Sequence, residues 1–354
     1  KYKRSKKLRK ILDLIVVKIK TTKSYVSKRK KPLNLFDEDK KLFESEFSRE
    51  IPETFYKVYK NITLEENKLF RYGSIALDPK FYKMDTSNWN SFKVSLKQLF
   101  KNSPFTDLNI IDKGSWVIDD KSQNYFHWMT DVLSRIKLIP NNELNEYPIL
   151  VPKEFLLESF ISETLELLNI PYKTYDIDKK VKINHLLVTS HAAPAGNYNN
   201  QLIHKVSKDL KEKSKNQVEK TYPKKIWLSR KNQDRRVLLN EEDVTKYLSE
   251  KGYEVIYPES ISISEQINLF NNAEIVISLH GASLTNIMHM NTNKKILEIR
   301  IFSDKVRNAF FSLASEFDLS YYYFLADAPS PNLVSDLSIN LIEFKKLMNR
   351  VEEK

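Results

Sequence analysis

The sequence predicts an α/β protein with two parallel sheets, each covered by helices, that face each other across a cleft. Short apolar runs alternate with helical periodicity from residue 147 to residue 325. A charged stretch that ends at Lys220, followed by Pro223, divides this alternation into two halves. The chain has 354 residues, which is more than a single hydrophobic core usually holds. Sheets of this class bind ligands beyond the carboxyl ends of their strands.

The first half, residues 36–222, is predicted as one domain. Its elements begin with mixed short segments and then alternate. A helix over 125–139 ends before Pro140, as expected of a residue that cannot continue a helix. We expect strands at 71–77, 115–118, 147–151, 172–176 and 185–189, and further helices at 154–168 and 201–213.

The second half, residues 223–335, alternates more regularly and is predicted as the second domain, followed by a C-terminal helix within 336–354. Gly252 follows one predicted helix in a capping position, and Ser262 or Ser264 begins the next. We expect strands at 225–229, 253–257, 274–279, 295–300 and 321–325, and helices at 241–250, from 262 or 264 to 272, after Ala282, at 305–317 and at 337–351.

Residues 1–35 form a separate basic segment. Seven of the first ten residues are Lys or Arg, and apolar residues from Leu8 to Ile19 then repeat at helical spacing. Such a helix lies on an anionic membrane through residues 1–20, or packs on the body with its basic face in water. The second basic cluster, Lys28 to Lys31, precedes Pro32 and is interpreted as a linker.

The composition narrows the choice of partner. A net charge of +12 and a pI near 9.3 favour an acidic ligand, and nucleic acid, anionic lipid and sugar nucleotide all fit. The basic residues are scattered and no nucleic-acid recognition motif is present, so we predict no nucleic-acid partner. No apolar run is long enough to span a membrane. Cysteine is absent, which excludes disulfides and suits a reducing cytosol.

The segment Glu274 to Asn286, E-I-V-I-S-L-H-G-A-S-L-T-N, is the most informative in the chain. An apolar strand stops at His280-Gly281-Ala282-Ser283 and a helical pattern begins. The first N–H groups of such a helix, together with its dipole, favour an anion. Gly281 would let that anion approach the backbone. The G-x-G-x-x-G and Walker lysine motifs are absent, and a tight turn capped by Ser283 is the structural alternative.

Other residues at predicted strand ends support an anion site. Arg230 follows the strand 225–229, and Arg235 and Arg236 lie in the loop after it. Guanidinium groups bind phosphate oxygens in a bidentate way. Glu298 ends the apolar strand at 296–299, where a carboxylate can accept the hydroxyls of a ribose, or pair with Arg300 or Lys295 instead. Glu265 begins a helix, where stabilisation of the dipole is the alternative role.

A different chemistry is predicted on the helix 125–139. His127 and Asp131 are spaced i and i+4, so they share one face and can hydrogen-bond. An imidazole oriented by a carboxylate is a candidate general base, and a core histidine is the alternative. The patterns Asp176-Ile177-Asp178 and Asp37-Glu38-Asp39 resemble metal-binding motifs, but they lie apart from the arginines, so we predict no metal site.

In combination, these segments resemble glycosyltransferase family 61. The resemblance covers roughly residues 115 to 305. It rests on N-Y-F-H-W-M-T-D at 124–131, V-P-K-E-F at 151–155, W-L-S-R at 227–230, R-R-V-L-L-N-E-E-D-V at 235–244, the segment 264–286, and I-L-E-I-R at 296–300.

The resemblance implies a B-type, inverting glycosyltransferase with two Rossmann-like domains and a nucleotide-sugar donor, which is a UDP-sugar in most relatives. It implies that the donor contacts Arg230, Arg235, Glu265, Gly281, Ala282, Ser283, Asn286 and Glu298, and that His280 either contacts the donor as well or braces the turn. It also implies that His127 or Asp131 is the catalytic base, and that Asn124, Tyr125 and Trp128 lie on the acceptor side. Lys121-Ser122-Gln123 departs from the family pattern, which usually carries a glycine there.

We therefore predict transfer of a sugar to a glycan or lipid-linked glycan hydroxyl without a metal cofactor. The Lys-, Asn- and Ile-rich composition is typical of an AT-rich genome, which suggests a bacterial capsule or lipopolysaccharide enzyme in the cytoplasm or on the inner face of the cytoplasmic membrane. The alternatives are a catalytically silent nucleotide-sugar-binding protein and a basic nucleic-acid-binding protein.

Overall fold

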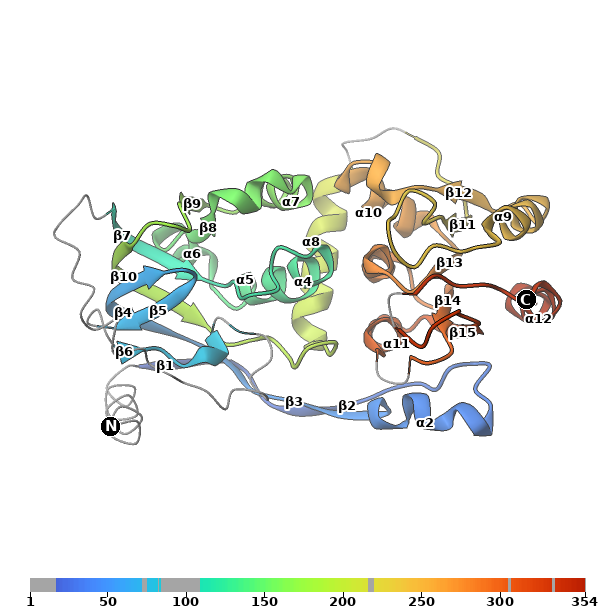
Figure 1. Ribbon diagram of the computed structural model, residues 1–354. Coiled ribbons are helices and arrows are strands. Elements are labelled where there is room, and N and C mark those ends of the chain that lie inside the picture. The colour runs from blue at the N-terminus through green and yellow to red at the C-terminus, as the bar shows by residue number, and fades with distance from the viewer. Residues whose placement is uncertain are drawn as a thin grey trace. The chain divides into compact units, whose positions relative to one another are not determined.

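The computed structural model describes residues 17–71, 75–81, 83, 109–215, 220–304, 307–332 and 335–353. These residues form two compact units, each around its own large sheet (Figure 1). The first unit comprises the described residues up to Tyr25 together with Pro52–Ala195. The second comprises the described parts of Val26–Ile51 and Gly196–Lys354. The division differs from the predicted boundary at 222, because residues 26–51 and the described residues between 196 and 222 pack with the second unit.

The second unit has a five-stranded sheet in the order β12-β11-β13-β14-β15, and every pairing in it is parallel. Counted along the chain, this is the order 2-1-3-4-5 of a doubly wound fold. The prediction of a parallel sheet in this half is confirmed. The strands are β11 (Lys225–Leu228), β12 (Glu254–Ile256), β13 (Ile275–Leu279), β14 (Lys295–Ile301) and β15 (Ser320–Ala326).

Helices cover both faces of this sheet (Figure 1). Trp227, Ile277 and Ile299 pack on one face with side chains of α9 and α12 in a single apolar core. The other helices, α8, α10 and α11, contact the 3-10 helix η7. The helix bounds are α8 (Asn200–Ser214), α9 (Glu241–Glu250), η6 (Pro258–Ser260), α10 (Ile263–Asn272), η7 (Ala282–His289), α11 (Ala309–Glu316) and α12 (Leu341–Glu352).

Residues 26–51 are an integral part of the second unit, so the prediction of a linker at Lys28 to Lys31 is wrong. Arg29 is buried and bonds Glu46 at 2.8 Å and Asn197 at 2.7 Å. Phe43 is fully buried and its ring contacts Tyr323. Burial of a paired arginine anchors this segment to the fold. Its elements are β2 (Tyr25–Lys28), η1 (Asp37–Asp39), α2 (Lys40–Phe43), η2 (Glu44–Glu46) and β3 (Ser48–Ile51), with β2 and β3 forming a small sheet of their own.

The first unit has an eight-stranded mixed sheet in the order β6-β5-β4-β10-β7-β8-β9, with β1 also paired to β4. Strands β10, β7, β8 and β9 are parallel, whereas β1, β5 and β10 are antiparallel to β4. The prediction of a wholly parallel sheet is therefore wrong for this unit. The strands are β1 (Lys18–Thr22), β4 (Thr54–Glu65), β5 (Lys68–Arg71), β6 (Ile75–Ala76), β7 (Asn109–Trp116), β8 (Ile149–Pro152), β9 (Tyr172–Tyr175) and β10 (Val181–Thr189).

The helices of the first unit are short and lie mostly between β7 and β9. They include a π-helical turn at Trp128–Val132, next to short α-helical turns. Their bounds are η3 (Pro79–Phe81), α4 (Tyr125–His127), η4 (Trp128–Val132), α5 (Leu133–Ile136), α6 (Asn141–Glu146), η5 (Lys153–Leu157) and α7 (Ser159–Leu167).

The predicted basic helix falls largely on residues 1–16, which lie outside the described residues. Beyond it, Lys18–Thr22 is a strand that pairs with β4, and Lys18 forms an ion pair with Glu53. The helical pattern therefore does not extend to Ile19. In the part of the chain that the structure describes, no helix has the length and apolar character needed to cross a membrane.

Candidate functional site

The carboxyl ends of β11 and β13 form the edge where this fold class binds ligands. The two strands are neighbours, with Leu228 paired to Ser278. From β11 the chain continues to β12 on one side, and from β13 it continues to β14 on the other. The connections therefore diverge at this point, which leaves space for a ligand in doubly wound sheets. Arg230 and Gly281 follow the two strand ends.

Arg230 and Gly281 are in direct contact. A Cβ at position 281 would overlap Nη1 of Arg230, so the turn accommodates the guanidinium because residue 281 has no side chain. From the sequence we expected an anion to approach the backbone at Gly281. In the structure, the guanidinium of Arg230 occupies this space. Arg230 Nη2 also donates to the carbonyl of Arg235 at 3.1 Å, and its Nε has no hydrogen-bond partner among the described residues.

Arg236, rather than Arg235, directs its guanidinium at the His280 turn. Its Nη1 donates to the carbonyl of His280 at 2.9 Å, whereas the side chain of Arg235 is exposed. Arg236 has φ 56°, a left-handed conformation that is uncommon for a residue with a side chain. Such backbone strain is concentrated at binding sites. The sequence identified the loop, but the backbone conformation selects the second arginine of the pair.

Positive charge is concentrated at this edge. Burial, together with the neighbouring cations Arg230 and Arg307, lowers the pKa of Arg236 to about 10. Burial also lowers the pKa of Arg230. Like charges held together in a half-buried position repel one another. An anion with several oxygens would relieve this repulsion through charge-assisted hydrogen bonds.

The helix that follows the turn is a 3-10 helix over Ala282–His289, with Gly281 at its N-cap. The backbone amides of Ala282 and Ser283 belong to its first turn, where N–H groups lack partners within the helix. No side chain caps this end, so the alternative of a Ser283 cap is wrong. Asn286 is fully buried and donates to Gln266 at 2.8 Å, which fixes η7 against α10. Its predicted contact with a donor remains a prediction.

His280 stabilises the turn from the sheet side. Its Nδ1 lies 2.5 Å from Oε1 of Glu298, and its ring contacts Phe310 edge to face. Glu298 is fully buried, and its second oxygen accepts from Tyr321 at 2.6 Å. Burial and the nearby carboxylate raise the pKa of Tyr321 well above its usual value, so it remains a donor. Because both oxygens of Glu298 have partners inside the unit, the geometry does not favour its predicted contact with a ribose.

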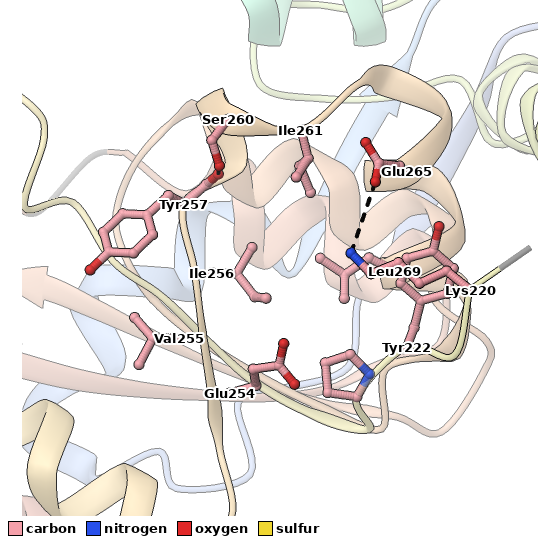
Figure 2. Close-up of a pocket in the computed structure, with 11 residues that line it drawn as sticks. Lys220, Tyr222, Glu254, Val255, Ile256, Tyr257, Ser260, Ile261, Glu265 and Leu269 are labelled. Atoms are coloured by element: carbon pink, nitrogen blue, oxygen red, sulfur yellow. Dashed lines mark hydrogen bonds and ion pairs between the residues drawn. The ribbon is translucent and has the colours of Figure 1, made fainter. Parts of the chain in front are cut away.

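Glu265 has a structural partner at its helix start. It forms a capping box with Ser262 at the beginning of α10. The same residue lines a pocket of about 200 Å³ beside the edge strand β12, where it lies 3.9 Å from Nζ of Lys220 (Figure 2). The capping role alone is sufficient to explain an acidic residue at this position.

His127 and Asp131 form the predicted pair in the first unit. Nδ1 of His127 lies 2.7 Å from Oδ2 of Asp131. The side chain of His127 is 21% exposed and that of Asp131 is 9% exposed, so the imidazole is the accessible member. Burial raises the pKa of Asp131, against the hydrogen bond from His127. The pair lies where an α-helical turn becomes a π-helical one, a distortion that is frequent at functional sites.

The three predicted acceptor-side residues occupy different environments. Asn124 is exposed and caps α4 by accepting from the amide of Phe126 at 3.0 Å. The half-buried ring of Tyr125 contacts Phe160 edge to face. Trp128 is fully buried and donates to Thr164 at 2.8 Å. Trp128 therefore supports the helix from the core, whereas Asn124 lies at the surface.

Among the described residues, no three or more His, Asp or Glu side chains are grouped as metal ligands. Asp176 instead forms ion pairs with Lys153 and Lys179, and Asp39 accepts from Tyr323.

The sequence also matches a family model. The model of Glycosyltransferase 61 matches residues 125–297. These residues form a glycosyltransferase family 61 domain. The protein is accordingly a glycosyltransferase, which acts on a sugar donor and an acceptor. No curated protein matches the chain in a sequence search.

The glycosyltransferase 61 domain includes both candidate regions. It begins at Tyr125, within the His127 motif, and it contains Arg230, Arg236 and the 280–283 turn. Glu298 lies directly after its last matched residue. The family match therefore extends over parts of both units.

Sequence reasoning missed three polar residues of the first unit: Asp119, Arg135 and His191. Asp119 and Arg135 are almost or fully buried, whereas His191 is half-buried, and both Arg135 and His191 lie close to the carboxylate of Asp119. Their positions, far apart in the sequence and without ligand-type spacing, provided no signal. The strand register of β7 and β10 brings Asp119 and His191 together.

Proposed function

We propose that this glycosyltransferase binds a nucleoside-diphosphate sugar, a UDP-sugar, at the carboxyl edge of β11 and β13 and inverts the anomeric centre during transfer. The observation that supports this most is the contact between Arg230 and Gly281, with Arg236 donating to the carbonyl of His280. Two guanidinium groups and the first amides of η7 then surround one diphosphate. The B-type arrangement with two Rossmann-like units is part of this proposal.

The reaction is a single displacement. The imidazole of His127, oriented by Asp131, takes the proton of the acceptor hydroxyl. The hydroxyl oxygen forms a bond to the anomeric carbon as the bond from that carbon to the diphosphate oxygen breaks. The diphosphate leaves with the electron pair, and Arg230, Arg236 and the amides stabilise its added charge. In this proposal the cations make a metal ion dispensable, so transfer should persist in EDTA.

The acceptor in this proposal is a glycan or lipid-linked glycan hydroxyl in bacterial surface polysaccharide synthesis. The composition of the chain and the family resemblance support it. A location in the cytoplasm, on the inner face of the membrane, would place the enzyme beside such an acceptor. The basic segment at residues 1–16 carries the positive charge that an anionic surface attracts.

The test is a thermal-shift and calorimetric titration with UDP, GDP, CMP and TDP, followed by donor hydrolysis with a panel of nucleotide sugars. UDP should raise the Tm of the wild type, and Arg230→Ala should weaken its binding at least about tenfold. Arg350→Ala, which changes an exposed arginine on α12 of the same unit, is the matched control. A melting curve that none of the four nucleotides moves would overturn the donor site.

A further inference from the structure

A second cluster of titratable groups, Asp119, Arg135 and His191, lies in the same unit as the His127–Asp131 pair. Trp116 of β7 and Val188 of β10 are register partners in a parallel pair of strands. Asp119 and His191 each follow three residues later, so they leave the same edge of the sheet. Arg135, on α5, completes the cluster.

The cluster is centred on one oxygen of Asp119. Nη1 of Arg135 and Nδ1 of His191 each lie 3.7 Å from Oδ2 of Asp119. These distances exceed hydrogen-bond range, and neither Oδ2 of Asp119 nor Nη1 of Arg135 has a hydrogen-bond partner among the described residues. Polar atoms that are buried without partners are costly, and functional sites are one place where proteins retain them.

The guanidinium of Arg135 is fixed in place. Its Nε donates to Oγ1 of Thr189 at 3.1 Å, and its Nη2 donates to the carbonyl of Phe81 at 3.0 Å. The side chain has no exposed surface. Arg135 therefore cannot contact a substrate, but its charge can affect the titratable groups around it.

Arg135 also interacts with the His127–Asp131 pair, which contains the candidate general base. It lies four residues after Asp131, and Asp119 and Asp131 both interact electrostatically with it. One buried guanidinium thus faces two buried carboxylates. Each carboxylate has an imidazole beside it, and these imidazoles are the more accessible groups, with side chains 21% exposed in His127 and 18% in His191.

We propose that Arg135 is a positioning residue that joins two imidazole–carboxylate pairs, His127–Asp131 and His191–Asp119, into one acceptor-side site in which both carboxylates face the same guanidinium. This inference rests on the proposed role of His127 as the base. Together with the hydrogen bond from His127, Arg135 favours the ionised form of Asp131, so that the carboxylate can orient and stabilise the imidazole that takes the proton. Without Arg135, two buried carboxylates would face each other, and one would bind a proton.

The pKa values of the neighbouring groups agree with this arrangement. Burial, and then the charge of Arg135, lower the pKa of His191 to about 4, against the opposing effect of Asp119. The backbone of Lys80 and Lys83 also faces this ring. Burial raises the pKa of Asp131, the hydrogen bond and charge of His127 lower it, Asp119 raises it, and Arg135 lowers it. Loss of the Arg135 charge should therefore raise the pKa of both Asp131 and His191.

The first experiment is the pH dependence of transfer in the full chain carrying Arg135→Gln or Arg135→Lys. In the Gln variant, the acidic limb of kcat/KM should move up by about one pH unit or more. The Lys variant, which keeps the charge, should stay near the wild type. A Gln variant with a lower rate but an unmoved limb would show that Arg135 is only structural.

The second experiment requires neither transfer nor an Arg135 variant. The chain has six histidines, so the His191 signal in histidine-labelled protein can be assigned from its loss in His191→Gln. In the wild type it should not titrate between about pH 5 and pH 8. A His191 signal with an ordinary pKa would overturn the coupling, whether or not the enzyme uses the proposed donor. If no nucleotide binds but the His191 signal does not titrate in this range, only the proposed function is overturned.

Discussion

The guanidinium of Arg230 occupies the space that a Cβ of residue 281 would need. The backbone of Gly281 is extended, with φ −178°, so conformation alone does not require glycine there. The requirement is steric and comes from a residue that lies 51 positions earlier in the chain. The turn and the arginine therefore form one unit of structure.

Gly281→Ala should weaken UDP binding at least about tenfold with little change in folding, because the new methyl group displaces the end of a flexible side chain. Calorimetric titration and a melting curve measure the two effects. Gly252→Ala is the matched control. Gly252 has φ +80° and open space around it, so this change should cost about 1 kcal/mol of stability and leave UDP binding unchanged. Equal UDP affinity in both variants would contradict the role of the Arg230–Gly281 contact.

Arg236→Ala should reduce UDP affinity more than Arg235→Ala does. Arg236 is half-buried and bonded to the His280 carbonyl, whereas the Arg235 side chain is exposed, and exposed charges contribute little. We expect a loss of about tenfold or more for Arg236 and about threefold or less for Arg235. Titration of both variants at one salt concentration measures this, and the reverse order would restore Arg235 as the diphosphate ligand.

Glu298→Gln tests whether this carboxylate stabilises the turn or binds ribose. The variant should lose about 1–3 kcal/mol of stability, because His280 and Tyr321 lose a charged acceptor. Its UDP affinity should fall only through the weakened turn. Comparing UDP with 2′-deoxy-UDP separates the roles. If the wild type discriminates between them and Glu298→Gln does not, Glu298 binds the ribose.

Asp131→Asn should abolish transfer and leave UDP binding intact. Because burial raises the pKa of Asp131 in the folded protein, keeping it ionised costs stability at pH values above that raised pKa. This loss of stability appears as pH rises from the pKa of Asp131 in the unfolded chain, about 3.9, through its higher pKa in the folded protein. The Tm of Asp131→Asn relative to the wild type should therefore be higher at pH 7 than at pH 4. A variant with normal turnover would remove Asp131 from the mechanism.

Much of the second unit could be predicted from the sequence. The helix 241–250 has the predicted bounds, and the five predicted strands of that half all exist. Ser262 is the cap of α10, with Glu265 completing the capping box. Each of these elements has a local signal: an apolar run, a helical period or a capping residue. Such signals depend only on residues close together in the sequence, so they can be recognised without knowledge of the fold.

The first unit was less predictable for the same reason. The strand β4 spans twelve residues, Thr54–Glu65, and mixes polar and apolar residues. It is stabilised by pairing with β1, β5 and β10, which come from distant parts of the sequence. Residues 26–51 likewise join the second unit through Arg29 and Phe43, and no local pattern indicates that partnership.

The candidate site residues also divide into those that sequence spacing identified and those that only the structure brought together. Sequence spacing alone was sufficient for the His127–Asp131 pair, since one helix holds both residues, and for the arginine-bearing loop after β11. Three-dimensional packing was needed to select Arg236 over Arg235, to pair Glu298 with His280, and to gather Asp119, Arg135 and His191. These relationships depend on strand register and burial, which are set by contacts between residues far apart in the chain.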